Sequence, residues 1–172
     1  MDLHPLFVHF PIALLTLYSA LEVVRRFTKA SYWMPLRAVL VVVGTLAAFV
    51  TLSTGEGAEE LFKENEFRDV LELHSLLATV TTWLYAILAI SYLLLWMARH
   101  TSFLQLLPKA LERPAALLLR IASFIVDTPI AIVLAILGFL GLLLVGSLGA
   151  ILVYGPAFDP VTSLVYKVLF GG

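Results

Sequence analysis

Long apolar stretches alternate with short polar stretches along the whole chain. Four of the apolar stretches cover residues 6–24, 34–52, 73–97 and 129–154. Each is close to the roughly 20 residues that a helix needs to cross the hydrocarbon core of a bilayer. The pattern predicts four membrane-spanning helices, over about residues 5–25, 33–54, 70–98 and 128–154.

A fifth apolar stretch, over about residues 102–126, is interrupted by charged residues. Its first polar positions have the spacing of an amphipathic helix that lies in the membrane interface. These positions are Gln105, Lys109, Glu112 and Arg113. The expected fold is therefore an all-α integral membrane protein. It consists of an antiparallel bundle of four transmembrane helices and a cytoplasmic interfacial amphipathic segment, in a single domain over residues 1–172.

The composition supports a membrane protein and excludes several other classes. Hydrophobic residues make up 61% of the chain and charged residues 13%, against about 25% charged residues in an ordinary soluble domain. The net charge of -1 argues against nucleic-acid binding, because no basic cluster is large enough to neutralise a run of phosphates. The lack of cysteine excludes disulfides, iron–sulfur clusters and covalent haem attachment.

Charges between the predicted spans indicate which side of the membrane each loop occupies. Basic residues are concentrated between the first and second spans and between the third and fourth. The positive-inside rule places these residues in the cytoplasm. We therefore expect a multi-pass protein of the cytoplasmic (inner) membrane with both termini on the external, periplasmic side. The basic residues are Arg25, Arg26, Lys29, Arg37, Arg99, Lys109, Arg113 and Arg120.

Some polar and aromatic residues fall inside or at the ends of the predicted spans. Glu22, near the inner end of the first span, has the helical spacing to pair with Arg25 or Arg26. Tyr92, together with Tyr32 and the tryptophans, lies near positions where an aromatic belt forms at a membrane interface.

Three of the four histidines fall at the outer ends of the predicted spans. His4 and His9 belong to the first span and His74 to the third, whereas His100 lies at the cytoplasmic end of the third. His9 and His74 each lie about four residues into their helix, or roughly 6 Å along its axis. Two imidazoles at one depth in a bundle can hold a haem iron from both sides without a covalent link. We therefore expect a haem b with His9 and His74 as axial ligands and His4 as a further candidate.

Other interpretations of the same residues stay open. Interfacial histidines are often only solvated or hydrogen-bonded, and the chain would then be a cofactor-free membrane anchor or assembly subunit. Three imidazoles also suit copper or zinc, so His4, His9 and His74 could serve metal binding or transport. Small residues on one side of the fourth span serve close helix packing with or without a cofactor. These residues are Gly138, Gly141, Gly146 and Gly149.

Four sequence stretches carry a resemblance to known proteins. They are HPLFVHFPIALL in the first span, TLSTGEG at the end of the second, HSLLATVTTWLYAIL in the third and GFLGLLLVGSLGAILVYG in the fourth. Together they resemble the bacterial four-helix membrane family called domain of unknown function 2231 over nearly the whole chain. That family often carries a further histidine shortly after the LVY motif, where this chain has Gly155 and Pro156.

The resemblance implies a small b-type cytochrome module, because family members look like such modules and some are fused to Rieske-type or c-type cytochrome domains. It assigns the ligand histidines to His4, His9 and His74. The implied function is electron transfer between a membrane quinol, or a partner subunit, and an external acceptor. With both axial positions filled, the chain would be an electron carrier rather than an enzyme. The candidate partners are the lipid bilayer, a quinol or quinone, an external c-type cytochrome or Rieske-type protein, and further copies in a homo-oligomer.

Overall fold

The computed structural model describes residues 4–28, 33–59, 67–100 and 108–171, except for the side chains of residues 4–7 and 56–59. Most of these residues belong to six α-helices, and no strand occurs among them. The prediction of an all-α protein is confirmed. The helices are α1 (His4–Val24), α2 (Trp33–Glu59), α3 (Arg68–His100), α4 (Lys109–Asp127), α5 (Ile130–Tyr154) and α6 (Pro160–Phe170).

Within the described ranges, three helical stretches are long and apolar enough to cross a membrane. They are Trp33–Gly55, Arg68–His100 and Ile130–Tyr154. These stretches correspond to the second, third and fourth predicted spans. The first predicted span corresponds to α1, whose described apolar part, Val8–Val24, is shorter than the other three.

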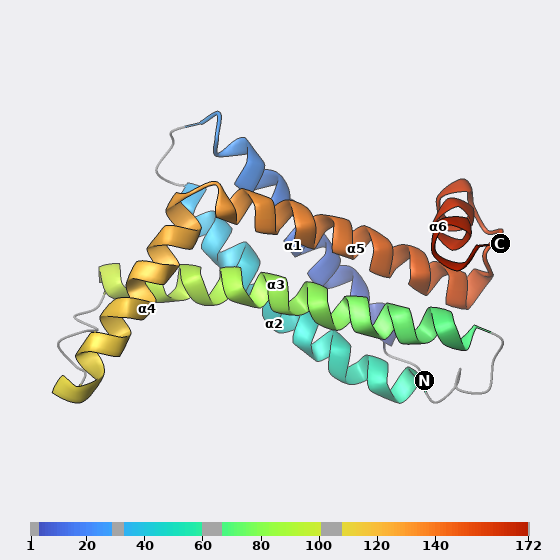
Figure 1. Cartoon of the computed structure of the whole chain (residues 1–172), viewed down its shortest axis with the longest axis horizontal. Helices are drawn as coiled ribbons and strands as arrows, with labels where there is room; N and C mark the ends of the chain where they lie inside the picture. The colour runs from blue at the N-terminus through green and yellow to red at the C-terminus, as the bar shows by residue number, and fades with distance from the viewer. Residues whose placement is uncertain (1–3, 29–32, 60–66, 101–107, 172) are drawn as a thin grey trace.

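Helices α1, α2, α3 and α5 lie side by side in a bundle (Figure 1). Both α1 and α3 pack on α2 and on α5, so α1 and α3 face each other across the centre of the bundle. Helix α4 lies across α3 at one end of the bundle, and α6 lies beside α5 at the other end (Figure 1). We call these the α4 end and the α6 end.

Glycines allow α5 to approach α3 closely. A Cβ atom added at Gly138 would lie 2.7 Å from Cζ of Tyr85, and one added at Gly141 would collide with the side chain of Thr81. A Cβ atom added at Gly146, in contrast, would have no described residue of another helix within 4 Å. Small residues of this kind let backbones pack tightly in lipid. The packing interpretation of the glycine stripe is confirmed at Gly138 and Gly141.

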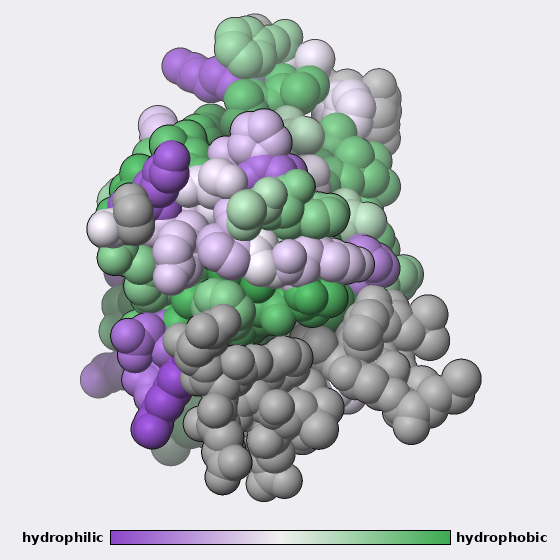
Figure 2. Space-filling model, turned by 90° about the vertical axis from the view of Figure 1, so that its right-hand side faces the viewer, coloured by the Kyte–Doolittle hydropathy of each residue, from purple (hydrophilic) through white to green (hydrophobic). Residues whose placement is uncertain are grey.

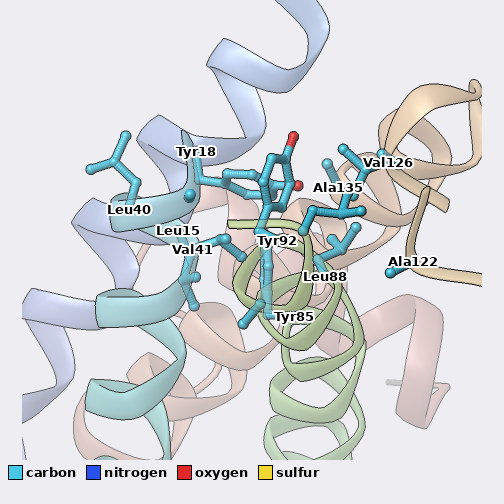
Figure 3. Packing of buried hydrophobic residues seen from close by; sticks show 14 of the residues in the cluster. Leu15, Tyr18, Leu40, Val41, Tyr85, Leu88, Tyr92, Ala122, Val126 and Ala135 are labelled. Atoms are coloured by element: carbon cyan, nitrogen blue, oxygen red, sulfur yellow. The ribbon is translucent and has the colours of Figure 1, made fainter. Parts of the chain in front are cut away.

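Two clusters of buried apolar residues stabilise the fold. The larger cluster joins α1, α2, α3, α4 and α5 around a group of tyrosine rings toward the α4 end (Figure 3). The smaller cluster lies at the α6 end, where Val165 and Phe170 of α6 pack against Val70, Leu148 and Ile151. Figure 2 looks onto the α6 end, where hydrophobic and hydrophilic residues are intermixed at the surface.

Helix α6 is an element that the apolar pattern does not predict. It begins with a capping box, in which Asp159 Oδ1 accepts hydrogen bonds from the backbone N–H groups of Val161 and Thr162. Thr162 Oγ1 in turn accepts one from the backbone N–H of Asp159. Pro160 occupies the first turn, and Gly171 ends the helix with a φ of 69°. A helix of 11 residues is too short to be stable alone and depends on its packing against α3 and α5.

Candidate functional site

His74 of α3 is the predicted ligand whose surroundings are best defined. Its ring is half-buried, and its Nδ1 lies 3.0 Å from the backbone carbonyl oxygen of Val145 on α5. A Cβ atom at Gly149 would lie 3.3 Å from Cε1 of the ring, so the glycine makes room for the imidazole. Because a carbonyl only accepts hydrogen bonds, Nδ1 carries the proton in this contact. In the neutral imidazole, the lone pair that can bind a metal then belongs to Nε2.

His9 of α1 has different surroundings. Its side chain is exposed, and in a regular helix position 9 lies opposite position 18. Tyr18 is fully buried, so the exposed side of α1 is the one that carries His9. His74 is turned toward α5. No contact among the described residues joins the two histidines, and their ligation of one iron stays a prediction.

The other two histidines lie at opposite ends of the molecule. His4 begins α1, and its side chain lies outside the described residues. His100 ends α3, is exposed and packs against Trp96 with ring centroids 5.4 Å apart. In the described part of the chain, no three His, Cys, Asp or Glu side chains gather as a metal site. The copper or zinc alternative depends on His4 and is therefore not tested by this geometry.

Small residues line three helices between the central tyrosine rings and His74. On each helix a buried residue is followed by a half-buried one, and α3 and α5 are buried again at Val70 and Leu148. The buried and half-buried neighbours are Ala48 and Thr51 on α2, Thr81 and Ala78 on α3, and Gly138 and Gly141 on α5. These residues between the tyrosine rings and His74 are therefore all small.

A second candidate site is a cluster of charged and phenolic side chains in the core. Glu22 of α1 is fully buried. Its Oε1 lies 2.6 Å from Nε of Arg25, and its Oε2 lies 3.0 Å from Nη1 of Arg37 on α2. The hydroxyl of Tyr92 on α3 donates a hydrogen bond of 2.7 Å to Oε2 and accepts one of 2.8 Å from Arg37. The predicted pairing of Glu22 with Arg25 is confirmed, and Arg37 and Tyr92 complete the Glu22 cluster.

The Glu22 cluster connects all the helices that meet at the α4 end. It joins α1, α2 and α3 directly, and Arg25 donates a hydrogen bond of 3.3 Å to the backbone carbonyl of Thr128, between α4 and α5. Ionisable groups inside a membrane bundle are costly unless they are paired, so they mark either a functional site or a device that fixes the fold. Each member of this cluster bonds to another member. These contacts favour a structural role, in which the Glu22 cluster fixes the positions of the helices relative to one another.

Three tyrosine rings fill the centre of the bundle beside the Glu22 cluster (Figure 3). The ring of Tyr18 makes edge-to-face contacts with Tyr85 and Tyr92, with centroids 6.2 and 6.0 Å apart. The hydroxyl of Tyr85 lies 2.8 Å from Oγ of Ser19. At this level α1 and α3 therefore meet through side chains.

The sequence pattern assigns two members of the Glu22 cluster differently. It counts Arg37 among the cytoplasmic loop charges, but this side chain lies in the core and the residue is 6% exposed. It also predicts Tyr92 in an interfacial aromatic belt, which is wrong because Tyr92 is fully buried. One signal could have identified the site. A lone arginine just inside an apolar span needs a buried partner, and Glu22 is the only acid within the first span.

Comparison with known proteins agrees with the membrane character of the chain. The model of a family described as predicted membrane protein (DUF2231) matches residues 1–158. The match covers α1 to α5 and every candidate site residue, and it ends before α6. Curated proteins and solved structures give no significant match. The chain therefore belongs to the DUF2231 family of predicted membrane proteins.

Proposed function

We propose that α1 is a fourth membrane span and that α1, α2, α3 and α5 cross the cytoplasmic (inner) membrane together. The distribution of charge supports one orientation, because exposed arginines such as Arg26, Arg99 and Arg113 lie at the α4 end. By the positive-inside rule, the α4 end then faces the cytoplasm, and both termini lie on the periplasmic side. His74 is near the periplasmic end in this orientation.

We propose further that the chain is a membrane electron-transfer module with one haem b bound by His74. The observation that carries this proposal is the 3.0 Å contact between His74 Nδ1 and the carbonyl oxygen of Val145. Metal-binding histidines commonly use such a bond to fix their tautomer and ring orientation. When bound, haem supplies reversible one-electron chemistry at its iron. The small, half-buried side chain of Ala78, one helical turn from His74, supports the same location.

A second histidine, from α1, would also hold the haem in this proposal, and His9 and His4 are the candidates. The depth of His9 matches that of His74, but the side chain of His9 is exposed. In a regular helix, positions 4, 11, 15 and 18 share one face, and position 9 lies on the other side. Pro11, Leu15 and Tyr18 are buried. Depth therefore favours His9, and helical register favours position 4.

In this role the chain passes single electrons between a membrane quinol, or a partner subunit, and an external c-type cytochrome or Rieske-type protein. If two histidines held the haem, it would supply electron transfer without substrate binding, and the chain would act as a carrier rather than as an enzyme. The protein contributes by holding the helices around the haem in fixed positions. The Glu22 cluster fixes the helices at the α4 end, and α6 covers apolar residues of α3 and α5 at the other end.

Absorption spectroscopy tests the haem proposal. The full chain, produced in haem-synthesising cells and purified in mild detergent, is expected to show a Soret band that shifts and sharpens on reduction with dithionite. His74→Ala is expected to abolish this band while circular dichroism stays helical. His100→Ala, a substitution at the exposed far end of the same helix, is the matched control and keeps the band. Of His4→Ala and His9→Ala, the variant that loses the band identifies the α1 ligand.

Three results would contradict this function. A colourless wild type with stoichiometric zinc or copper would indicate a histidine metal site instead. A colourless, metal-free wild type would indicate a membrane anchor or assembly subunit. A Soret band that survives His74→Ala would show that the haem is held elsewhere. Separately, failure of a quinol analogue to reduce the haem-loaded protein would exclude a quinol as the electron donor.

A further inference from the structure

Helix α4 has one face buried against the bundle. Ala122 and Val126 are each 2% exposed and belong to the larger apolar cluster, to which α3 and α5 also contribute. The helix lies across the end of α3 (Figure 1) and also contacts α5. The remaining faces of α4 are exposed and have no partner among the described residues.

Two exposed faces of opposite character flank the buried one. At 100° per residue, large apolar side chains lie about 40–160° from Ala122 on one side, and charged side chains lie about 80–180° from it on the other. The apolar residues are Leu117, Leu118, Ile121 and Phe124. The charged residues are Lys109, Glu112, Arg113, Arg120 and Asp127. A helix divided in this way suits the boundary between hydrocarbon and water.

The charged face of α4 is basic overall, with three cations against two carboxylates. Arg113 and Arg120 are seven residues apart, so they share a side of the helix about 10 Å apart along the axis. Exposed Arg26 and Arg99, at the ends of α1 and α3, add positive charge to the same end of the bundle. Guanidinium groups bind phosphate through paired hydrogen bonds. The surface is therefore complementary to phosphate groups that lie beside a hydrocarbon layer.

We propose that α4 binds the headgroups of anionic phospholipids through Arg113 and Arg120, while Ile121 and Phe124 lie among the acyl chains. Charge favours this occupant over a second copy of the chain, because a second copy would bring an equally basic face to the contact. The inference does not depend on haem binding. A haem-free protein would still be expected to select anionic lipid.

Lipid retention tests this inference. The full chain is reconstituted in vesicles of equal phosphatidylcholine and phosphatidylglycerol, extracted in mild detergent, and its retained lipids are measured by mass spectrometry. We expect the wild type to be enriched in phosphatidylglycerol, and the enrichment to fall as ionic strength rises. In the double variant Arg113→Gln/Arg120→Gln, the enrichment is expected to fall at least about fivefold. A fivefold change is about what a single basic residue near an anionic surface contributes.

The matched control is Arg68→Gln/Lys167→Gln, which removes two exposed basic residues from the other end of the bundle. It is expected to keep the wild-type enrichment. Equal retention of the two lipids by the wild type would overturn the inference. An equal loss in both double variants would also overturn it, since selection would then follow net charge. If the α4 variant changed the oligomeric state and left lipid retention unchanged, the occupant would be a second copy.

Discussion

Replacing Glu22 by alanine is expected to lower the free energy of unfolding by about 3–5 kcal/mol, the usual effect of removing one partner from a buried ion pair. The Glu22 carboxylate is fully buried and contacts Arg25, Arg37 and Tyr92. Without this carboxylate, the positive charge of Arg37 stays buried and loses the negative group that balances it. Water cannot replace the lost contacts unless the bundle opens. Thermal and denaturant unfolding in mild detergent, followed by circular dichroism, measures the effect.

The exposed pair Arg68–Glu72 provides the control for this prediction. Its Nε–Oε1 distance is 2.9 Å, but its side chains are 70% and 64% exposed. Glu72→Ala is therefore expected to cost less than about 0.5 kcal/mol. The double variant Glu22→Ala/Arg37→Ala is expected to lose less than the sum of its single variants, because the second substitution removes the stranded charge. If Glu22→Ala and Glu72→Ala lowered the free energy of unfolding equally, the Glu22 cluster would not be what fixes the helices.

The long helices could be predicted because a chain in lipid must satisfy its backbone hydrogen bonds within each span. This constraint leaves helix length and apolar content as the main variables, and both are readable from the sequence. The predicted spans 70–98 and 128–154 correspond closely to Arg68–His100 and Ile130–Tyr154. The charged fifth stretch likewise corresponds to α4, of which the structure describes Lys109–Asp127.

The partners of buried polar groups could be predicted only where they lie on one helix. The pairing of Glu22 with Arg25 follows from a spacing of three residues. Arg37 and Tyr92 reach the same carboxylate from α2 and α3, and that contact depends on how far each helix is rotated about its own axis. Apolar residues occur all around such a helix, so the hydrophobic pattern contains little information on rotation.

The same limit applies to the histidines. Counting residues from the helix ends gives the depth of His9 and His74 but not the direction of their side chains. The structure turns His74 toward Val145 and leaves His9 exposed. Helix α6 was not predicted for another reason. Its 11 residues are too few to form the long apolar stretch by which a membrane span is recognised. The sequence does contain signals for its two ends, an N-cap at Asp159 followed by Pro160 and a C-terminal glycine at Gly171.

Substituting Gly138 is expected to have the second large effect, because this residue sets the distance between α3 and α5. The Cβ atom of an alanine here would lie 2.7 Å from Cζ of Tyr85. The tyrosine ring cannot easily move, since it makes an edge-to-face contact with Tyr18 and its hydroxyl contacts Ser19. Gly138→Ala is expected to cost about 1–3 kcal/mol and Gly138→Val more. Unfolding in mild detergent, measured as for Glu22, gives the value.

Gly146 on the same helix is the matched control, because a Cβ atom there would have no neighbour from another helix within 4 Å in the described ranges. Gly146→Ala is expected to leave stability unchanged or raise it by up to about 1 kcal/mol through better helix propensity. Similar losses in the two alanine variants would mean that α5 needs flexible glycines rather than close packing. Because His74 contacts Val145 across the same pair of helices, an α5 displaced at Gly138 should also weaken that contact. Under the proposed haem function, Gly138→Ala is therefore expected to reduce haem retention, and Gly146→Ala is expected to preserve it.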